Sequence, residues 1–195
     1  VALSIEGAIF DLDDTLYSEK QYIRSGYNKI AKYLDDDTAA DKMWAYFEGG
    51  KPAIDCYLKD IGMEERKAEC LSIYRNQMPD IKLYDGVLAM IDHLKKHGIK
   101  VGIITDGRTE GQRNKLIALG LDQLVDDIII TDELGGVQFR KPNDISFRII
   151  QNRWRIPFEN IVYVGDNPAK DFQACRQLGM QSLYFRNKDG LYSTL

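Results

Sequence analysis

The sequence predicts a doubly wound α/β domain with a parallel sheet, interrupted by a small helical insertion. Short runs rich in valine and isoleucine recur along the chain, as is typical of strands buried on both faces. Amphipathic segments separate these runs, so strand and helix alternate from residue 81 onward. Residues 17–80 lack the buried-strand pattern. We therefore expect an α/β core formed by residues 1–16 and 81–195, with a helical domain at residues 17–80.

Five segments are the predicted strands, and the first four each end in an oxygen-bearing side chain. The runs end in turn residues, and continuous apolar runs of this length favour parallel strands over surface strands. The fifth segment, Ser-Leu-Tyr-Phe, is a weaker candidate. The predicted strands span residues 7–11, 101–106, 128–132, 161–166 and 182–185.

Four helices are predicted after residue 81. The first has apolar residues at positions 87, 88, 90, 91 and 94, which share one helical face, and Gly98 provides a C-terminal stop. The last begins with Asn167 as N-cap and a proline at the first helical position. The predicted helices span residues 87–97, 109–119, 144–154 and 168–179.

The insertion is also predicted to be helical. Tyr22, Tyr27 and Ile30 recur at helical spacing, and packing within the insertion explains most of its tyrosines better than substrate contact does. Gly49–Pro52 divides the segment, and Pro79 closes it.

Composition narrows the possible functions. The chain has 195 residues and a net charge of −4, with no basic run, which argues against nucleic-acid binding. Apolar residues make up 44% and charged residues 29%, as in ordinary globular proteins, and no run approaches a transmembrane span. The three cysteines lack CxxC spacing and fit a reducing compartment. A cytoplasmic location without a membrane partner is the default expectation, and the oligomeric state is left open.

Acidic side chains gather at the predicted ends of the strands. In open parallel sheets, ligands bind beyond the carboxyl ends of the strands, where the winding direction changes. Several carboxylates at one edge repel each other unless a cation binds among them, and Mg²⁺ prefers carboxylates, water and phosphate oxygens. The pattern therefore predicts a site for magnesium and phosphate. The strand-end residues are Asp11, Asp13, Thr105, Asp106, Thr131, Asp132 and Asp166.

Four motifs in order resemble those of the haloacid dehalogenase (HAD) superfamily. Asp11-Leu12-Asp13-Asp14-Thr15 fits the first motif, DxDx[TV], and Thr105 at the end of a strand resembles the second. Lys141 resembles the third, and Gly165-Asp166 followed by Asp171 resembles the acidic fourth. Each motif alone is weak, but the ordered set from residue 7 to 171 is specific.

The resemblance implies a phosphatase mechanism. Asp11 would attack phosphorus and form an aspartyl-phosphate. Asp13 would protonate the leaving oxygen and then activate the hydrolytic water. The carboxylates of Asp11 and Asp166 and the backbone carbonyl of Asp13 would hold Mg²⁺.

The remaining motif residues would support this reaction. Thr105 would bind the non-transferred phosphate oxygens, and Lys141 would neutralise the intermediate and orient the nucleophile. Asp171 would position Lys141 or a metal-bound water. Asp106 and Arg108 follow Thr105 and are further candidates for substrate binding. Turn formation is the alternative for Asp106, and a solvated loop side chain is the alternative for Arg108.

Within the superfamily, Asp13 favours phosphoryl transfer over dehalogenation. A dehalogenase expels halide and needs no acid for its leaving group, and the members with that activity lack this second aspartate. In the superfamily, an insertion between the first two motifs is a C1 cap that closes over the site, and residues 17–80 fit its position. A closing lid suits a small phosphorylated metabolite, such as a sugar phosphate or nucleotide, better than a phosphoprotein. A phosphomutase or phosphotransferase of the same fold stays open as an alternative.

Alternatives from other classes fit less well. A receiver domain of bacterial signalling also phosphorylates an aspartate, but on a later strand and without a cap. A catalytically silent binding module would be expected to lose a motif residue, and none is lost. A calcium loop starting at Asp11 would need glycine and glutamate where Leu16 and Tyr22 stand. His93 and His97 lie four residues apart on a predicted helix, a spacing that can bind zinc. They stand in its last turn beside lysines, where positive charge suits the end of a helix, and this favours a structural role.

Overall fold

A computed structural model describes residues 4–191 and 193 of the chain. Its centre is a five-stranded sheet in the order β3-β2-β1-β4-β5, and every pair of neighbouring strands is parallel. This order places the first strand in the middle and reverses the winding direction on either side of it, as predicted for a doubly wound sheet. The strands are β1 (Gly7–Phe10), β2 (Lys100–Thr105), β3 (Asp127–Ile130), β4 (Ile161–Gly165) and β5 (Gln181–Tyr184).

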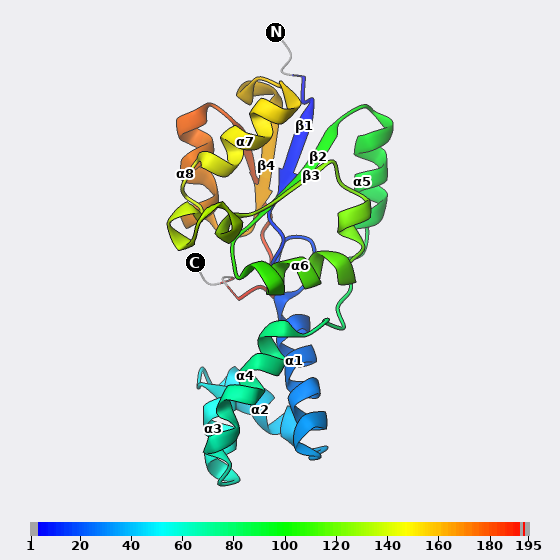
Figure 1. Ribbon diagram of the computed structural model, residues 1–195. Helices are drawn as coiled ribbons and strands as arrows, with labels where there is room; N and C mark the ends of the chain where they lie inside the picture. Colours follow the sequence, from blue (N-terminus) through cyan, green and yellow to red (C-terminus); the bar gives the residue numbers. More distant parts are fainter. Residues whose placement is uncertain (1–3, 192, 194–195) are drawn as a thin grey trace.

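Helices cover both faces of the sheet (Figure 1). Alternate residues of β1 point to opposite faces, so Phe10 joins one apolar cluster and Ile9 the other. Of the four core helices, two contribute to the Phe10 cluster and the other two to the Ile9 cluster, and Tyr22 from the segment between β1 and α5 also joins the Phe10 cluster. These helices are α5 (Val87–Lys96) and α6 (Thr109–Ala118) on the first face, and α7 (Ile145–Trp154) and α8 (Pro168–Leu178) on the second.

The predicted strands and helices of the core are confirmed, with boundaries that differ by one or two residues. The largest difference is at the end of the third strand. Thr131 and Asp132 leave the sheet and enter a short 3₁₀ turn. The Thr131 hydroxyl donates a hydrogen bond to Asp106, and Asp132 forms an ion pair with Arg140. The prediction extends the third strand to residue 132, but its pairing with β2 ends at Ile130. Thr131 and Asp132 form these side-chain contacts instead.

The segment between β1 and α5 contains four α-helices with a separate apolar cluster (Figure 1). The cluster is centred on Ile30, Met43, Tyr57 and Cys70, which are fully buried. Figure 1 shows the carboxyl end of β1 pointing toward this helical bundle, so the bundle lies beyond the edge of the sheet that ends in acidic residues. The helices are α1 (Glu19–Leu34), α2 (Ala39–Glu48), α3 (Ala53–Asp60) and α4 (Lys67–Asn76).

Over the part of the chain that is described, no helix has both the length and the apolar character needed to cross a membrane.

Candidate active site

The loop that follows β1 places the first predicted carboxylate at the centre of the sheet edge. The backbone N–H of Asp11 donates to the carbonyl of Val164, which continues the pairing of β1 with β4 by one residue. The chain then turns sharply, because Asp14 adopts a left-handed conformation with φ of 57°. The side chain of Asp14 stabilises the turn by accepting hydrogen bonds from the backbone N–H groups of Glu19 and Leu191.

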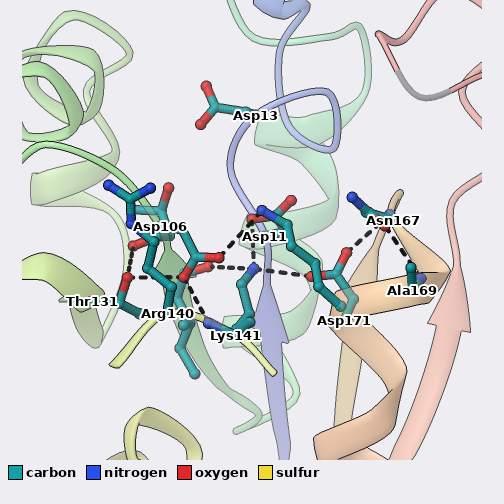
Figure 2. Close-up of polar contacts among 12 residues, drawn as sticks. Asp11, Asp13, Asp106, Thr131, Arg140, Lys141, Asn167, Ala169 and Asp171 are labelled. Atoms are coloured by element: carbon teal, nitrogen blue, oxygen red, sulfur yellow. Dashed lines mark hydrogen bonds and ion pairs between the residues drawn. The ribbon is translucent and has the colours of Figure 1, made fainter. Parts of the chain in front are cut away.

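Lys141 is the buried cation at this edge, and its side chain is 0% exposed. Its Nζ lies 2.9 Å from Oδ1 of Asp11 and 3.0 Å from Oδ1 of Asp171 (Figure 2). It also donates to the hydroxyl of Tyr163 at 2.6 Å. Burial disfavours the charge, but the carboxylates of Asp11 and Asp171 outweigh it and raise the pKa of Lys141. A permanently charged ammonium therefore faces Asp11.

The two carboxylates paired with Lys141 belong to a cluster of three. Oxygens of Asp11, Asp166 and Asp171 all lie within 4.8 Å of one another, and the three residues are buried. Burial raises the pKa of Asp11 to about 8, against the opposing charge of Lys141, and burial also raises the pKa of Asp166 to about 6. Three carboxylates and one ammonium leave two negative charges when all are ionised, so a divalent cation would restore neutrality.

Asp171 is the most enclosed of the three carboxylates, with 0% exposure. Besides Lys141, its Oδ1 accepts from the hydroxyl of Tyr163 at 3.1 Å, and its Oδ2 accepts from the backbone N–H of Asn167 at 3.0 Å. Gly165 makes this close packing possible, because a Cβ at that position would lie 2.4 Å from Oδ2 of Asp171. These contacts suit Asp171 for positioning Lys141 better than for binding a ligand directly.

The side chain of Asp13 lies apart from the Lys141 network (Figure 2). Lys115 donates to its Oδ1 at 2.8 Å, Gln112 donates to its Oδ2 at 2.8 Å, and the Tyr17 hydroxyl also donates to Oδ1. Burial opposes ionisation of Asp13, but the positive charge of Lys115 and the hydrogen bonds from Lys115, Tyr17 and Gln112 together outweigh it, so the pKa of Asp13 is lowered. Asp13 therefore has a separate environment from Asp11, although only Leu12 separates them.

The end of β2 contributes Thr105, which is 0% exposed and whose Oγ1 accepts from Gln112 at 2.6 Å. Asp106 comes next, and its carboxylate accepts from Thr131, from the backbone N–H of Lys141 and from Lys170. With both oxygens engaged, Asp106 is better suited to holding the Lys141 loop than to contacting a substrate. Arg108 is exposed at the start of α6.

The structure thus brings Asp11, Lys141, Asp166 and Asp171 into one cluster, with Thr105 and Asp13 joined to each other through Gln112. Sequence reasoning missed Lys115, Gln112 and Tyr163. One signal was present for the first two, because the periodicity of residues 109–119 places Gln112 and Lys115 on one face, three positions apart, in a helix predicted to pack on the sheet.

Comparisons with known proteins agree with this geometry. The family model described as haloacid dehalogenase-like hydrolase matches residues 8–185. The glyceraldehyde 3-phosphate phosphatase of Methanocaldococcus jannaschii is 31% identical over 90% of this chain and 82% of its own length. The enzyme of the same name from Methanopyrus kandleri is 26% identical over 93% of this chain and 84% of its own length.

Solved structures show the same fold. The putative HAD-hydrolase YfnB from Bacillus subtilis, bound to magnesium, superposes with a TM-score of 0.67 at 19% identity, covering 94% of this chain and 87% of its own. A HAD-superfamily hydrolase from Geobacter sulfurreducens has a TM-score of 0.71 at 16% identity, covering 94% of this chain and 88% of its own. With the family model spanning nearly the whole chain and the four motifs in place, this protein belongs to the haloacid dehalogenase-like hydrolases.

Proposed function

We propose that this protein is a magnesium-dependent phosphatase that hydrolyses small phosphate monoesters through a phosphorylated Asp11. The observation that carries the proposal is the position of Asp11. Its carboxylate lies at the end of the central strand, 2.9 Å from the buried ammonium of Lys141, within a cluster that carries two uncompensated negative charges when all its groups are ionised. A nucleophilic carboxylate beside a fixed cation is what attack on a phosphate ester requires.

In the first half of the reaction, an oxygen of Asp11 attacks phosphorus as the bond from phosphorus to the ester oxygen breaks. Asp13 gives its proton to that oxygen, so the product leaves as an alcohol. Lys115 favours the ionised form of Asp13 in the free enzyme. The negative charge of an incoming phosphate ester acts in the opposite direction and favours the protonated form, which is the general acid.

In the second half, water attacks the phosphorus of the aspartyl-phosphate. The ionised Asp13 takes a proton from this water, the bond between phosphorus and Asp11 breaks, and inorganic phosphate leaves. Lys141 remains beside Asp11 throughout and balances the negative charge that returns to its carboxylate. Thr105, whose Oγ1 accepts a hydrogen bond from Gln112, would bind a non-transferred phosphate oxygen.

The acidic cluster fits a divalent metal. Asp11 and Asp166 would supply carboxylate oxygens and Asp13 a backbone carbonyl, which are the hard oxygen ligands that Mg²⁺ prefers. The raised pKa values of Asp11 and Asp166 support this assignment, because they show that the two carboxylates are poorly stabilised by the protein alone. When bound, the metal would supply charge that allows an anionic carboxylate to approach an anionic phosphate.

The names of the relatives and the helical bundle support a substrate class. Both relatives described above are named glyceraldehyde 3-phosphate phosphatases, so a three-carbon sugar phosphate is the first candidate. Helices α1–α4 lie beyond the strand ends, where a cap at residues 17–80 would close over the leaving group (Figure 1). A closed cap favours a small ester over a phosphoprotein.

A phosphate-release screen tests the proposal. The enzyme is assayed with magnesium against about a hundred phosphorylated metabolites, including glyceraldehyde 3-phosphate, with Asp11→Asn as the matched control. We expect wild-type enzyme to release phosphate from one or a few small monoesters, and both EDTA and Asp11→Asn to abolish the release. Activity that survives EDTA, or that equals the mutant's, would reject the proposal.

A further inference from the structure

Lys115 is a buried lysine that none of the four family motifs includes. It lies on α6 and is only 5% exposed, although most lysines on helices remain in solvent. Its Nζ sits 2.8 Å from Oδ1 of Asp13 and 4.3 Å from the ring centre of Tyr22 on α1. The charge is therefore paired with a carboxylate on one side and packed against an aromatic face on the other.

Gln112 completes the arrangement from the same helix. It lies one turn before Lys115, and its amide Nε2 reaches Oδ2 of Asp13 at 2.8 Å and Oγ1 of Thr105 at 2.6 Å. Lys115 and Tyr17 hold the other oxygen of Asp13. Both oxygens of the carboxylate are thus fixed by side chains from two different segments, which restricts its rotation as well as its position.

The two buried lysines have different partners. Lys141 contacts Asp11 and Asp171, while Lys115 contacts Asp13. Burying a lysine costs free energy that a simple apolar contact between α6 and α1 would not require, since a methionine could fill similar space. A purely structural role therefore explains the contact with Tyr22, but it does not explain why the charge is aimed at Asp13.

Building on the proposed function, we infer that Lys115, together with Gln112, is a positioning residue for Asp13. They would hold the carboxylate where it can deliver a proton to the ester oxygen as the phosphorus–oxygen bond breaks, and later take a proton from the attacking water. Without Lys115, Oδ1 of Asp13 would keep only the Tyr17 hydroxyl as its donor, and the carboxylate would be held less firmly in this position. Small displacements of a catalytic group are costly, and about 1 Å can reduce a rate about a hundredfold.

Leaving-group dependence separates this role from general support of the fold. An alkyl ester, such as glyceraldehyde 3-phosphate or glycerol 3-phosphate, needs its leaving oxygen protonated, whereas p-nitrophenolate leaves without a proton. We expect Lys115→Met to lower kcat/KM for the alkyl ester about tenfold or more, while kcat/KM for p-nitrophenyl phosphate changes little. With p-nitrophenyl phosphate, a burst of one p-nitrophenolate per enzyme should precede a slow steady state, because hydrolysis of the phospho-enzyme still needs Asp13 as base.

Three further variants make the test decisive. Lys96→Met removes an exposed lysine outside the site, which pairs with Asp92 at 2.7 Å. This control should leave kcat/KM unchanged for both substrates. Lys115→Gln keeps a polar side chain but removes the charge and shortens the reach to Asp13, so it replaces Lys115→Met, with the same expected selectivity, if the methionine variant fails to fold. Asp13→Asn should show the same selectivity as Lys115→Met, with a larger loss, about 10²-fold to 10⁴-fold on the alkyl ester.

The outcomes distinguish the two proposals. If Asp13→Asn is selective for the alkyl ester but folded Lys115 variants lose activity equally on both substrates, or lose none, the role of Lys115 is wrong and the proposed function stands. Faster turnover in Lys115→Met would also overturn the inference, because it would mean that Lys115 restrains Asp13. If Asp13→Asn shows no selectivity, the acid–base role of Asp13 fails, and the inference fails with it.

Discussion

Lys141 shows how one side chain organises the site. Its ammonium is fully buried and has two carboxylates within 3.0 Å, so its charge is more than compensated. Such a network is not strong evidence of net stabilisation, because removing three charges from water is expensive. Removing only one partner is different, since the remaining carboxylates stay buried without their cation. The arrangement therefore holds Asp11 in place, and the free-energy cost of burying these charges is offset by the rest of the fold.

The first prediction concerns this lysine. Lys141→Met should destabilise the metal-free protein by about 3–5 kcal/mol, because Asp11 and Asp171 lose their counter-charge. Urea unfolding in EDTA measures the change. Lys141→Met combined with Asp171→Asn should recover part of the loss, as one of the two uncompensated carboxylates is removed. Equal stability of wild type and Lys141→Met would contradict the network described here.

At the scale of elements, the packing of α1 on α4 depends on a glycine. A Cβ at Gly26 would lie 2.3 Å from the ring of Tyr74, closer than any real Cβ contact. Glycine inside a helix normally costs about 1 kcal/mol relative to alanine. Its presence in the middle of α1 is therefore explained by the close approach of the two helices rather than by the helix itself.

Two alanine substitutions with opposite expected signs form the second prediction. Gly26→Ala should destabilise the protein by about 1–3 kcal/mol, because overpacking against Tyr74 outweighs the gain in helix propensity. Gly111→Ala on α6 is the matched control. Its Cβ would meet its nearest atoms at 3.6 Å, an ordinary contact, so it should stabilise by about 0.5–1 kcal/mol. Thermal unfolding measures both, and a stabilised Gly26→Ala would show that α1 and α4 pack less closely.

The core elements could be predicted because their signals are local. Apolar runs indicate buried strands, and the parallel order of these strands brings Asp11, Thr105 and Asp166 to one edge. The partners of Asp13 could not be predicted in this way. Periodicity places Gln112 and Lys115 on one helical face, but it does not specify which carboxylate they meet across the fold. A helical lysine is usually solvated, so the sequence favours the wrong environment for Lys115.

On the scale of the whole molecule, the segment after β5 packs against the turn that follows β1, although the two lie far apart in the sequence. Asn187 donates to the carbonyl of Asp14 and to the hydroxyl of Tyr84, and Lys20 at the start of α1 pairs with Asp189 at 2.9 Å. Residues after β5 thus contact the turn that presents Asp11 and Asp13. The acidic cluster at this sheet edge contains three buried carboxylates. We therefore expect the stability of the protein to depend on both pH and metal.

The third prediction is a pH dependence of the metal-free protein. The folded-state pKa values of about 8 for Asp11 and about 6 for Asp166 exceed the unfolded value of about 3.9. Between these values the folded state keeps protons that the unfolded state has released, so stability should fall as pH rises from about 5 to 8. Saturating magnesium should raise stability most at the upper end of this range, where the carboxylates are free to bind it.

Thermal unfolding in EDTA across this pH range is the measurement. Asp11→Asn should make the decline less steep, because one of the groups with a strongly raised pKa no longer titrates. Asp92→Asn, which removes an exposed carboxylate on α5, is the control and should leave the slope unchanged. A stability that rises from about pH 5 to 8 without metal would contradict the assigned signs.

Chemical trapping of the phosphorylated residue is the decisive measurement for the role of Asp11. Enzyme turning over its substrate with magnesium is quenched and treated with borohydride, which reduces an aspartyl-phosphate to homoserine, and the peptides are analysed by mass spectrometry. We expect homoserine at position 11 that depends on substrate and is absent in Asp11→Asn. Homoserine at position 13 or 166 would contradict the role of Asp11 as nucleophile. The absence of homoserine in Asp13→Asn that is turning over, where the phospho-enzyme should accumulate, would contradict it as well.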